Sequence, residues 1–167
     1  MDEWDPAFLE ALAPDRQLII FDNIGISSTS GDVPEHAEDQ AKAAASFIRA
    51  LGLKSVDVIG FSMGGYVCQV LALTEPELIR KVILCGSSCP GSKETEPPEP
   101  IFFATATKTN WSFDDKVVLF YADSPDSRAR GRLAEDRIEA QLRVGQEPKV
   151  PEKQWRNLEK IIGNFSA

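Results

Sequence analysis

Ser62 is the residue whose surroundings point most directly to chemistry. It stands in the segment Gly60-Phe61-Ser62-Met63-Gly64-Gly65, after a β-branched apolar run at residues 56–59 and before a longer apolar run that ends at Pro76. The first run is too short for a helix and is typical of a buried strand, whereas the second predicts a helix. A strand, a glycine-flanked turn with a central serine, and a helix together predict a nucleophile elbow.

An elbow needs these residue types at this spacing. A tight turn must lift the serine hydroxyl out of the end of the sheet, which makes Ser62 the predicted nucleophile. We expect Gly60 and Gly64 to remove the clash between strand and helix, two residues before and after the serine. The helix begins after Ser62, so the backbone N–H of Met63 is the predicted oxyanion donor. The alternative is a glycine-rich turn in an ordinary nucleotide-binding unit.

Composition excludes several classes of function. The 167 residues carry 18 basic and 26 acidic side chains, giving a net charge of −8, which argues against nucleic acid and anionic membrane surfaces as partners. No apolar run reaches transmembrane length and no signal peptide is recognised, so we predict a cytoplasmic protein. Cys68, Cys85 and Cys89 are predicted to be reduced thiols. With one histidine in the chain, we expect no metal site and no cofactor.

Apolar periodicity predicts an α/β fold, in which a short parallel sheet with flanking helices is followed by a helical region. We expect an α/β core at residues 1–89, a proline- and glutamate-rich linker at 90–100 and a helical cap region at 101–167. The predicted strands lie at residues 17–21, 56–59 and 80–85. The predicted helices lie at residues 4–12, 34–51, after residue 62, 113–122 with Ser112 as its cap, 125–144 and 151–162.

Residues 1 to about 165 resemble the middle of an α/β-hydrolase, and in particular the group with a Gly-Phe-Ser-Met-Gly-Gly elbow. The resemblance also rests on Phe21-Asp22-Asn23, Ala50-Leu51-Gly52-Leu53, and residues 73–86 and 122–128. It implies a partial α/β-hydrolase fold and a serine hydrolase acting on a small-molecule ester or other acyl substrate, with the cap shaping the pocket. Ser62 matches the family nucleophile, and Met63 matches the residue whose backbone N–H forms half of the oxyanion hole.

The chain departs from the family pattern at both ends and in one loop. The His-Gly oxyanion motif would precede residue 1, and the strands with the triad acid and histidine would follow residue 167, so we expect a chain truncated at both ends. In the loop after Asp22, Ser27 replaces the second glycine of the pattern Asp-x-x-Gly-x-Gly-x-Ser. A strand would also be missing between residues 17–21 and 56–59, which would leave unpaired sheet edges open to self-association.

No other residue is expected to complete the triad. His36 is the single histidine, and its polar turn indicates a solvated surface residue rather than a base for Ser62. Asp22 is expected to cap its own loop, and residues 85–89 contain no carboxylate. Because a serine without a base is a weak nucleophile, we expect very low activity from this chain alone. Two alternatives stay open, namely a non-catalytic interaction module that keeps the elbow as a structural turn, and a split enzyme completed by another chain.

Overall fold

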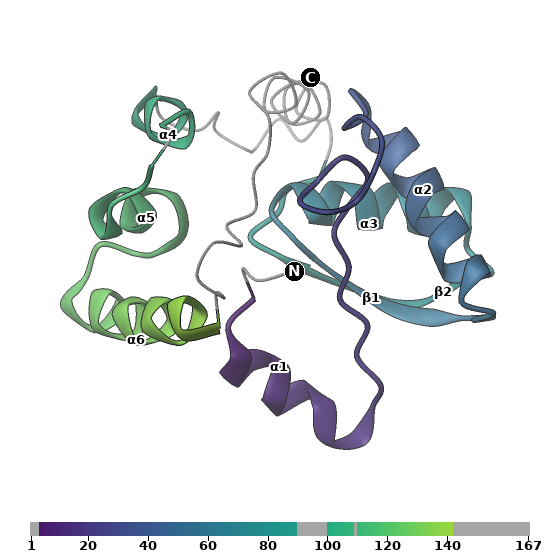
Figure 1. Ribbon diagram of the computed structural model, residues 1–167, viewed down its shortest axis with the longest axis horizontal. Helices are drawn as coiled ribbons and strands as arrows, with labels where there is room; N and C mark the ends of the chain where they lie inside the picture. Colours follow the sequence, from purple (N-terminus) through teal and green to yellow (C-terminus); the bar gives the residue numbers. More distant parts are fainter. Residues whose placement is uncertain (1–3, 90–99, 109, 142–167) are drawn as a thin grey trace. The chain divides into compact units, whose positions relative to one another are not determined.

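A computed structural model describes residues 4–89, 100–108 and 110–141 (Figure 1). Contacts divide these residues into two compact units. The sheet unit consists of residues 22–89, and the helical unit consists of residues 4–21 together with the described residues from 100 to 141. The helix predicted at 151–162 and all but the last residue of the predicted linker lie outside the described residues.

The sheet unit is built around one strand–helix–strand motif. β1 (Val56–Phe61) and β2 (Ile79–Cys85) run parallel, and α3 (Met63–Thr74) connects them. A parallel pair requires a crossover of this kind, usually a helix. Val58 lies opposite Val82 in the ladder. This is the element order that the sequence predicts, and it confirms the α/β fold class.

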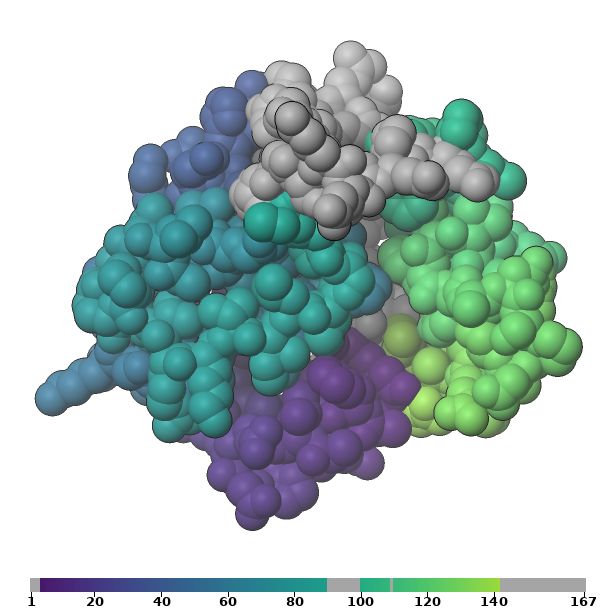
Figure 2. All heavy atoms as spheres, turned by 180° about the vertical axis from the view of Figure 1, so that it is seen from behind, coloured from purple at the N-terminus to yellow at the C-terminus, as the bar shows by residue number. Residues whose placement is uncertain are grey.

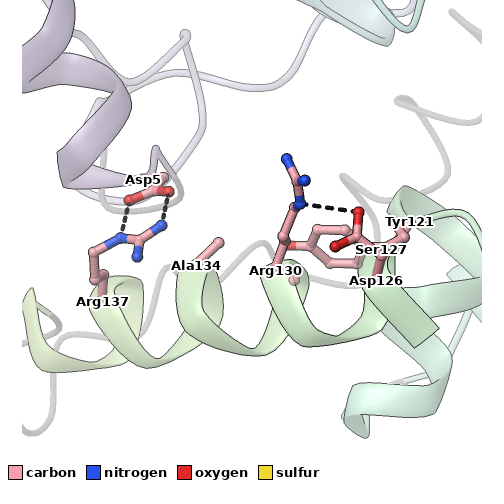
Figure 3. Close-up of a pocket in the computed structure, with 8 residues that line it drawn as sticks. Asp5, Tyr121, Asp126, Ser127, Arg130, Ala134 and Arg137 are labelled. Carbon is pink, nitrogen blue, oxygen red and sulfur yellow. Dashed lines mark hydrogen bonds and ion pairs between the residues drawn. The ribbon is translucent and has the colours of Figure 1, made fainter. Parts of the chain in front are cut away.

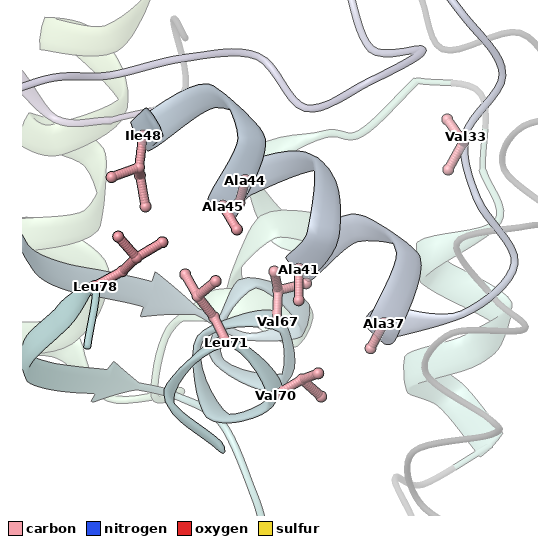
Figure 4. Packing of buried hydrophobic residues seen from close by; sticks show 10 residues of the cluster. All are labelled: Val33, Ala37, Ala41, Ala44, Ala45, Ile48, Val67, Val70, Leu71 and Leu78. Atoms are coloured by element: carbon pink, nitrogen blue, oxygen red, sulfur yellow. The ribbon is translucent and has the colours of Figure 1, made fainter. Parts of the chain in front are cut away.

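Helix α2 (Ala37–Ala50) packs on α3 through a face of small side chains (Figure 4). Ala41 and Ala45 are each 1% exposed, and Leu71 of α3 is 2% exposed. Alanines on α2 leave room for the larger side chains of α3, which fill the space between the helices. The buried cluster comprises Val33, Ala37, Ala41, Ala44, Ala45, Ile48, Val67, Val70, Leu71 and Leu78. Burial of each Val, Leu or Ile contributes about 1.5–3 kcal/mol, so this cluster stabilises the helix on which the serine turn depends.

The two strands are covered less completely than parallel strands usually are. Phe61, Ile83 and Leu84 are 45%, 46% and 45% exposed, although parallel strands normally have both faces buried. In the space-filling view, teal atoms of the segment that contains β1, α3 and β2 form a broad area of the surface (Figure 2). In the part of the chain that the structure describes, each strand pairs only with the other. Self-association through these edges stays a prediction.

The helical unit is held by caps and ion pairs. Its elements are α1 (Pro6–Leu12), the 3-10 turn η1 (Ala13–Asp15), α4 (Pro100–Ala106), α5 (Phe113–Phe120) and α6 (Pro125–Gln141). Ser112 caps α5 as predicted, in a capping box with Asp115. Arg137 of α6 donates to both carboxylate oxygens of Asp5, at 2.8 and 2.6 Å, and so ties α1 to α6.

A buried carboxylate joins α5 and α6. Glu135 is 7% exposed, and it accepts hydrogen bonds from the Tyr121 hydroxyl at 2.9 Å and from the Lys116 ammonium. Burial and the bond to Glu135 raise the pKa of Tyr121 to about 12, so the phenol stays protonated as a donor. The Tyr121 ring lies 3.0 Å from the position that a Cβ on Gly131 would take, which explains the glycine inside α6.

Two features differ from the sequence prediction. No strand is assigned to residues 17–21, because an apolar run forms a strand only beside a neighbour that shares its hydrogen-bond ladder. Helix α4 was not predicted, and it is supported by the Trp111 indole N–H, which donates to the Thr105 carbonyl at 3.1 Å. The other described helices lie where periodicity places them, with ends shifted by a few residues. None of the helices in the described ranges has both the length and the apolar character needed to cross a bilayer.

Candidate active site

Ser62 is the single residue between the end of β1 at Phe61 and the start of α3 at Met63. Its backbone has φ 50° and ψ −121°, a conformation that non-glycine residues rarely adopt. Such a conformation costs on the order of 1–3 kcal/mol and persists only where the surrounding structure enforces it. The serine hydroxyl makes no capping hydrogen bond to α3, so it is not used to begin the helix.

Two backbone hydrogen bonds hold this strained residue. The Ser62 N–H donates to the Cys85 carbonyl at the end of β2, at 2.9 Å, and the Ser62 carbonyl accepts from the Gly65 N–H at 2.9 Å. The first bond ties the turn to the neighbouring strand, and the second closes the first turn of α3. Ser62 is therefore anchored on both sides.

The glycines around Ser62 differ in what surrounds their Cα atoms. A Cβ on Gly60 would lie 2.4 Å from the Gly64 carbonyl oxygen, so a larger residue would not fit at position 60. A Cβ on Gly64 would have no atom within 4 Å among the described residues, so its predicted steric role is wrong. The crowded helical position is Gly65, where a Cβ would lie 2.4 Å from Ser87 Oγ. It is the backbone of Gly64, rather than its missing side chain, that requires a glycine at position 60.

The N-terminus of α3 follows Ser62 directly. Met63 is the first residue of α3, and the first turn contains no acidic side chain. In the described ranges, the Met63 N–H donates to no backbone acceptor outside the helix. Free N–H groups and the positive end of the helix dipole favour an anion at this point.

His36 is placed as a surface residue, as the sequence predicts. It is exposed and occupies the N-cap position of α2. Within the described part of the chain, no hydrogen bond joins its ring to the Ser62 hydroxyl. The Asp22 carbonyl accepts from the Thr29 hydroxyl at 3.0 Å, while capping by its carboxylate stays a prediction. Cys68 is buried, and burial raises the pKa of its thiol to about 11.

The polar residues that surround the turn were not predicted from the sequence. Gln69 of α3 and the Ser87–Ser88 pair after β2 contact one another or the first turn of α3. One signal was available, because Gln69 is the polar exception between Val67 and Leu73 in an apolar helix. A polar side chain in such a position must find partners when it is partly buried.

The helical unit has a hollow of its own, of about 480 Å³ (Figure 3). It is lined by Asp5, Tyr121, Asp126, Ser127, Arg130, Gly131, Ala134 and Arg137. Its charged groups are paired with one another, since Arg130 lies 3.0 Å from Asp126 and Arg137 holds Asp5. None of the predicted site residues lines it, so Ser62 remains the candidate centre.

Comparisons with known proteins identify the family of the chain. The sequence matches the alpha/beta hydrolase fold family over residues 1–137. It is 37% identical over 86 residues to RutD of Rhizobium rhizogenes, which is provisionally named a carbamate hydrolase. That alignment covers 50% of this chain and 32% of RutD. The chain is 36% identical over 84 residues to the poly(3-hydroxyalkanoate) depolymerase of Ectopseudomonas oleovorans. That alignment covers 48% of this chain and 29% of the depolymerase.

A solved structure extends the similarity to nearly the whole chain. An alpha/beta hydrolase fold protein from Chitinophaga pinensis superposes with a TM-score of 0.85 at 29% identity, over 99% of this chain and 59% of that one. The chain therefore belongs to the alpha/beta hydrolase fold family. It spans less than two thirds of the length of each of these three relatives.

Proposed function

We propose that this chain carries the nucleophile and one oxyanion donor of a serine hydrolase. Ser62 Oγ attacks the carbonyl carbon of an ester or another activated acyl group, and its proton passes to a general base. The carbonyl oxygen becomes an oxyanion, which the Met63 N–H stabilises. The leaving group departs with a proton, and water then releases the acyl group from Ser62.

The observation that carries this proposal is the conformation of Ser62. Its φ of 50° lies in the left-handed region, at a point where a strand ends and a helix begins. A serine accepts this strain only where neighbouring contacts enforce it, and such outliers cluster at functional sites. An ordinary turn in this place would favour glycine.

The relatives indicate the breadth of acyl chemistry rather than one substrate. RutD is provisionally named for carbamates, and the depolymerase is named for a polyester. Both names describe a carbonyl group bonded to oxygen or nitrogen. We therefore propose a small molecule with such a carbonyl as the substrate class for Ser62.

Among the described residues, no hydrogen bond joins the Ser62 hydroxyl to a histidine or a carboxylate, which gives the proposal a quantitative consequence. A site that lacks its base retains a residual rate enhancement on the order of 10³-fold over water. The same observation favours the second candidate, a non-catalytic interaction module in which the turn is structural. Reactivity of Ser62 separates the two functions.

The test measures covalent labelling of Ser62 by a fluorophosphonate, located by mass spectrometry, with and without added imidazole. The serine oxygen displaces fluoride from phosphorus, and imidazole supplies a base that takes the serine proton. We expect slow labelling of Ser62 that rises with imidazole concentration and disappears when the protein is denatured.

Ser62→Ala should remove the labelled peptide. Ser46→Ala is the matched control, because Ser46 lies on the exposed side of α2 and donates to the Lys42 carbonyl at 2.9 Å. A folded wild-type chain with no labelling at Ser62, even in imidazole, would refute the hydrolase proposal and support the interaction module.

A further inference from the structure

The segment that follows β2 lies against the first turn of α3. Ser87 fills the space beside Gly65, with its Cβ 2.5 Å from the position of an added Cβ. The Tyr66 hydroxyl lies 3.2 Å from Ser88 Oγ. These contacts bring residues 86–88, which we call the post-β2 loop, next to the turn that holds Ser62.

A single side-chain amide links this loop to the helix. The Gln69 amide nitrogen donates to the Ser88 carbonyl at 2.9 Å and to the Gly65 carbonyl at 3.2 Å. Gln69 is partly buried, so both bonds are partly shielded from competing water. One NH₂ group therefore bridges the loop and the carbonyl of a residue three positions after Ser62.

The bridge acts together with the backbone bond at the other side of the turn. The Ser62 N–H donates to the carbonyl of Cys85, and Cys85 is the last residue of β2. Ser88 lies three residues further along the chain, and Gln69 holds it. The start of α3 is thus fixed to the end of β2 at two points, one before and one after the first turn.

We infer that Gln69 is a positioning residue for Ser62. It does not touch the reacting atoms. By holding the first turn of α3 against the post-β2 loop, it keeps the Met63 N–H and the Ser62 hydroxyl in a fixed relation to a bound acyl group. Small displacements of reacting groups lower rates strongly. This inference rests on the proposed function of Ser62.

The experiment compares Gln69→Met with Gln40→Met. Methionine keeps the length and helix preference of glutamine but has no N–H donor. Gln40 is a matched control in α2 because it is 2% exposed and its side-chain amide has no hydrogen-bond partner among the described residues. Gln69→Glu is the second variant, for use where Gln69→Met does not fold, because it keeps the side-chain shape and removes the NH₂ group.

Two quantities are measured on each folded variant. Hydrogen exchange reports the opening of residues 62–66 and of the post-β2 loop. The kinetics of fluorophosphonate labelling in imidazole give kinact and KI at Ser62. We expect Gln69→Met to speed exchange in both segments and to lower kinact about tenfold with KI unchanged, whereas Gln40→Met should change neither. A lower kinact at constant KI separates positioning from a general loss of structure.

The outcomes distinguish this inference from the proposed function. If wild-type Ser62 is labelled and Gln69→Met reacts at the wild-type kinact, the positioning role is wrong while the hydrolase proposal stands. If wild-type Ser62 is never labelled, the hydrolase proposal fails and the positioning role fails with it. If Gln40→Met lowers kinact as much as Gln69→Met does, the effect is general loosening and the inference is overturned.

Discussion

Replacing Gly65 by alanine should destabilise the protein, whereas the same change at Gly64 should not. A Cβ on Gly65 would lie 2.4 Å from Ser87 Oγ and 2.5 Å from Ser87 Cβ. Carbon atoms in contact prefer a separation of about 3.5–4.0 Å, so α3 and the loop after β2 would have to separate by about 1 Å. Overpacking of this kind costs about 1–3 kcal/mol.

The Gly64→Ala variant measures the gain in helix propensity that also accompanies Gly65→Ala. Both positions lie in the first turn of α3, and Gly→Ala in a helix gains up to about 1 kcal/mol. At Gly64 the new Cβ would meet no described atom within 4 Å, so that gain is unopposed. The difference between the two variants therefore isolates the clash with Ser87, which we expect to be about 1–3 kcal/mol in free energy of unfolding.

Urea unfolding followed by circular dichroism measures both variants, the single variant Ser87→Gly and the double variant Gly65→Ala/Ser87→Gly. Removing the Ser87 side chain should relieve the clash, so the double-mutant cycle should show a coupling energy of about 1–3 kcal/mol. Equal stability of the Gly64 and Gly65 variants would refute the close approach of the loop to α3. If Gly65→Ala lowers the free energy of unfolding equally in the Ser87→Gly background, a clash with Ser87 is not the cause.

Three further predictions concern backbone strain, acid stability and association. Ser27 has φ 51°, so Ser27→Gly should raise the free energy of unfolding by about 1 kcal/mol in urea titrations, while Ser28→Gly should not. The hydrogen bond from Lys108 is the largest cause that lowers the pKa of Asp115 from 3.8 to about 2. The resulting stabilisation is present above pH 3.8 and lost as the pH falls toward 2, so the acid-induced loss of helix should be steeper in the wild type than in Asp115→Asn. The open strand edges predict concentration-dependent self-association in sedimentation velocity, and Ile83→Lys should weaken it because a charge on an edge strand opposes pairing; an identical mass distribution for the two proteins would contradict this.

Local patterns in the sequence predicted an element correctly where residues close together in the chain are enough to form it. The run at residues 56–59 predicted β1, the periodic run after Ser62 predicted α3, and Ser112 predicted the start of α5. Strand alternation, helix periodicity and capping depend on residues within one or two turns of each other. The exposed position of His36 followed in the same way from its polar turn.

The tertiary structure decided which residues meet across the turn. Spacing suggested Gly64 as the glycine that avoids a clash, but Ser87 of a later segment lies beside Gly65 instead. The same segment supplies the acceptor for Gln69. The strand predicted at residues 17–21 was wrong for a related reason, since a ladder depends on a neighbour that the apolar run does not specify. The amino-acid sequence alone determined that Ser62 stands between a strand and a helix. The identity of its neighbours depended on chain segments more than twenty residues away, whose approach no local pattern encodes.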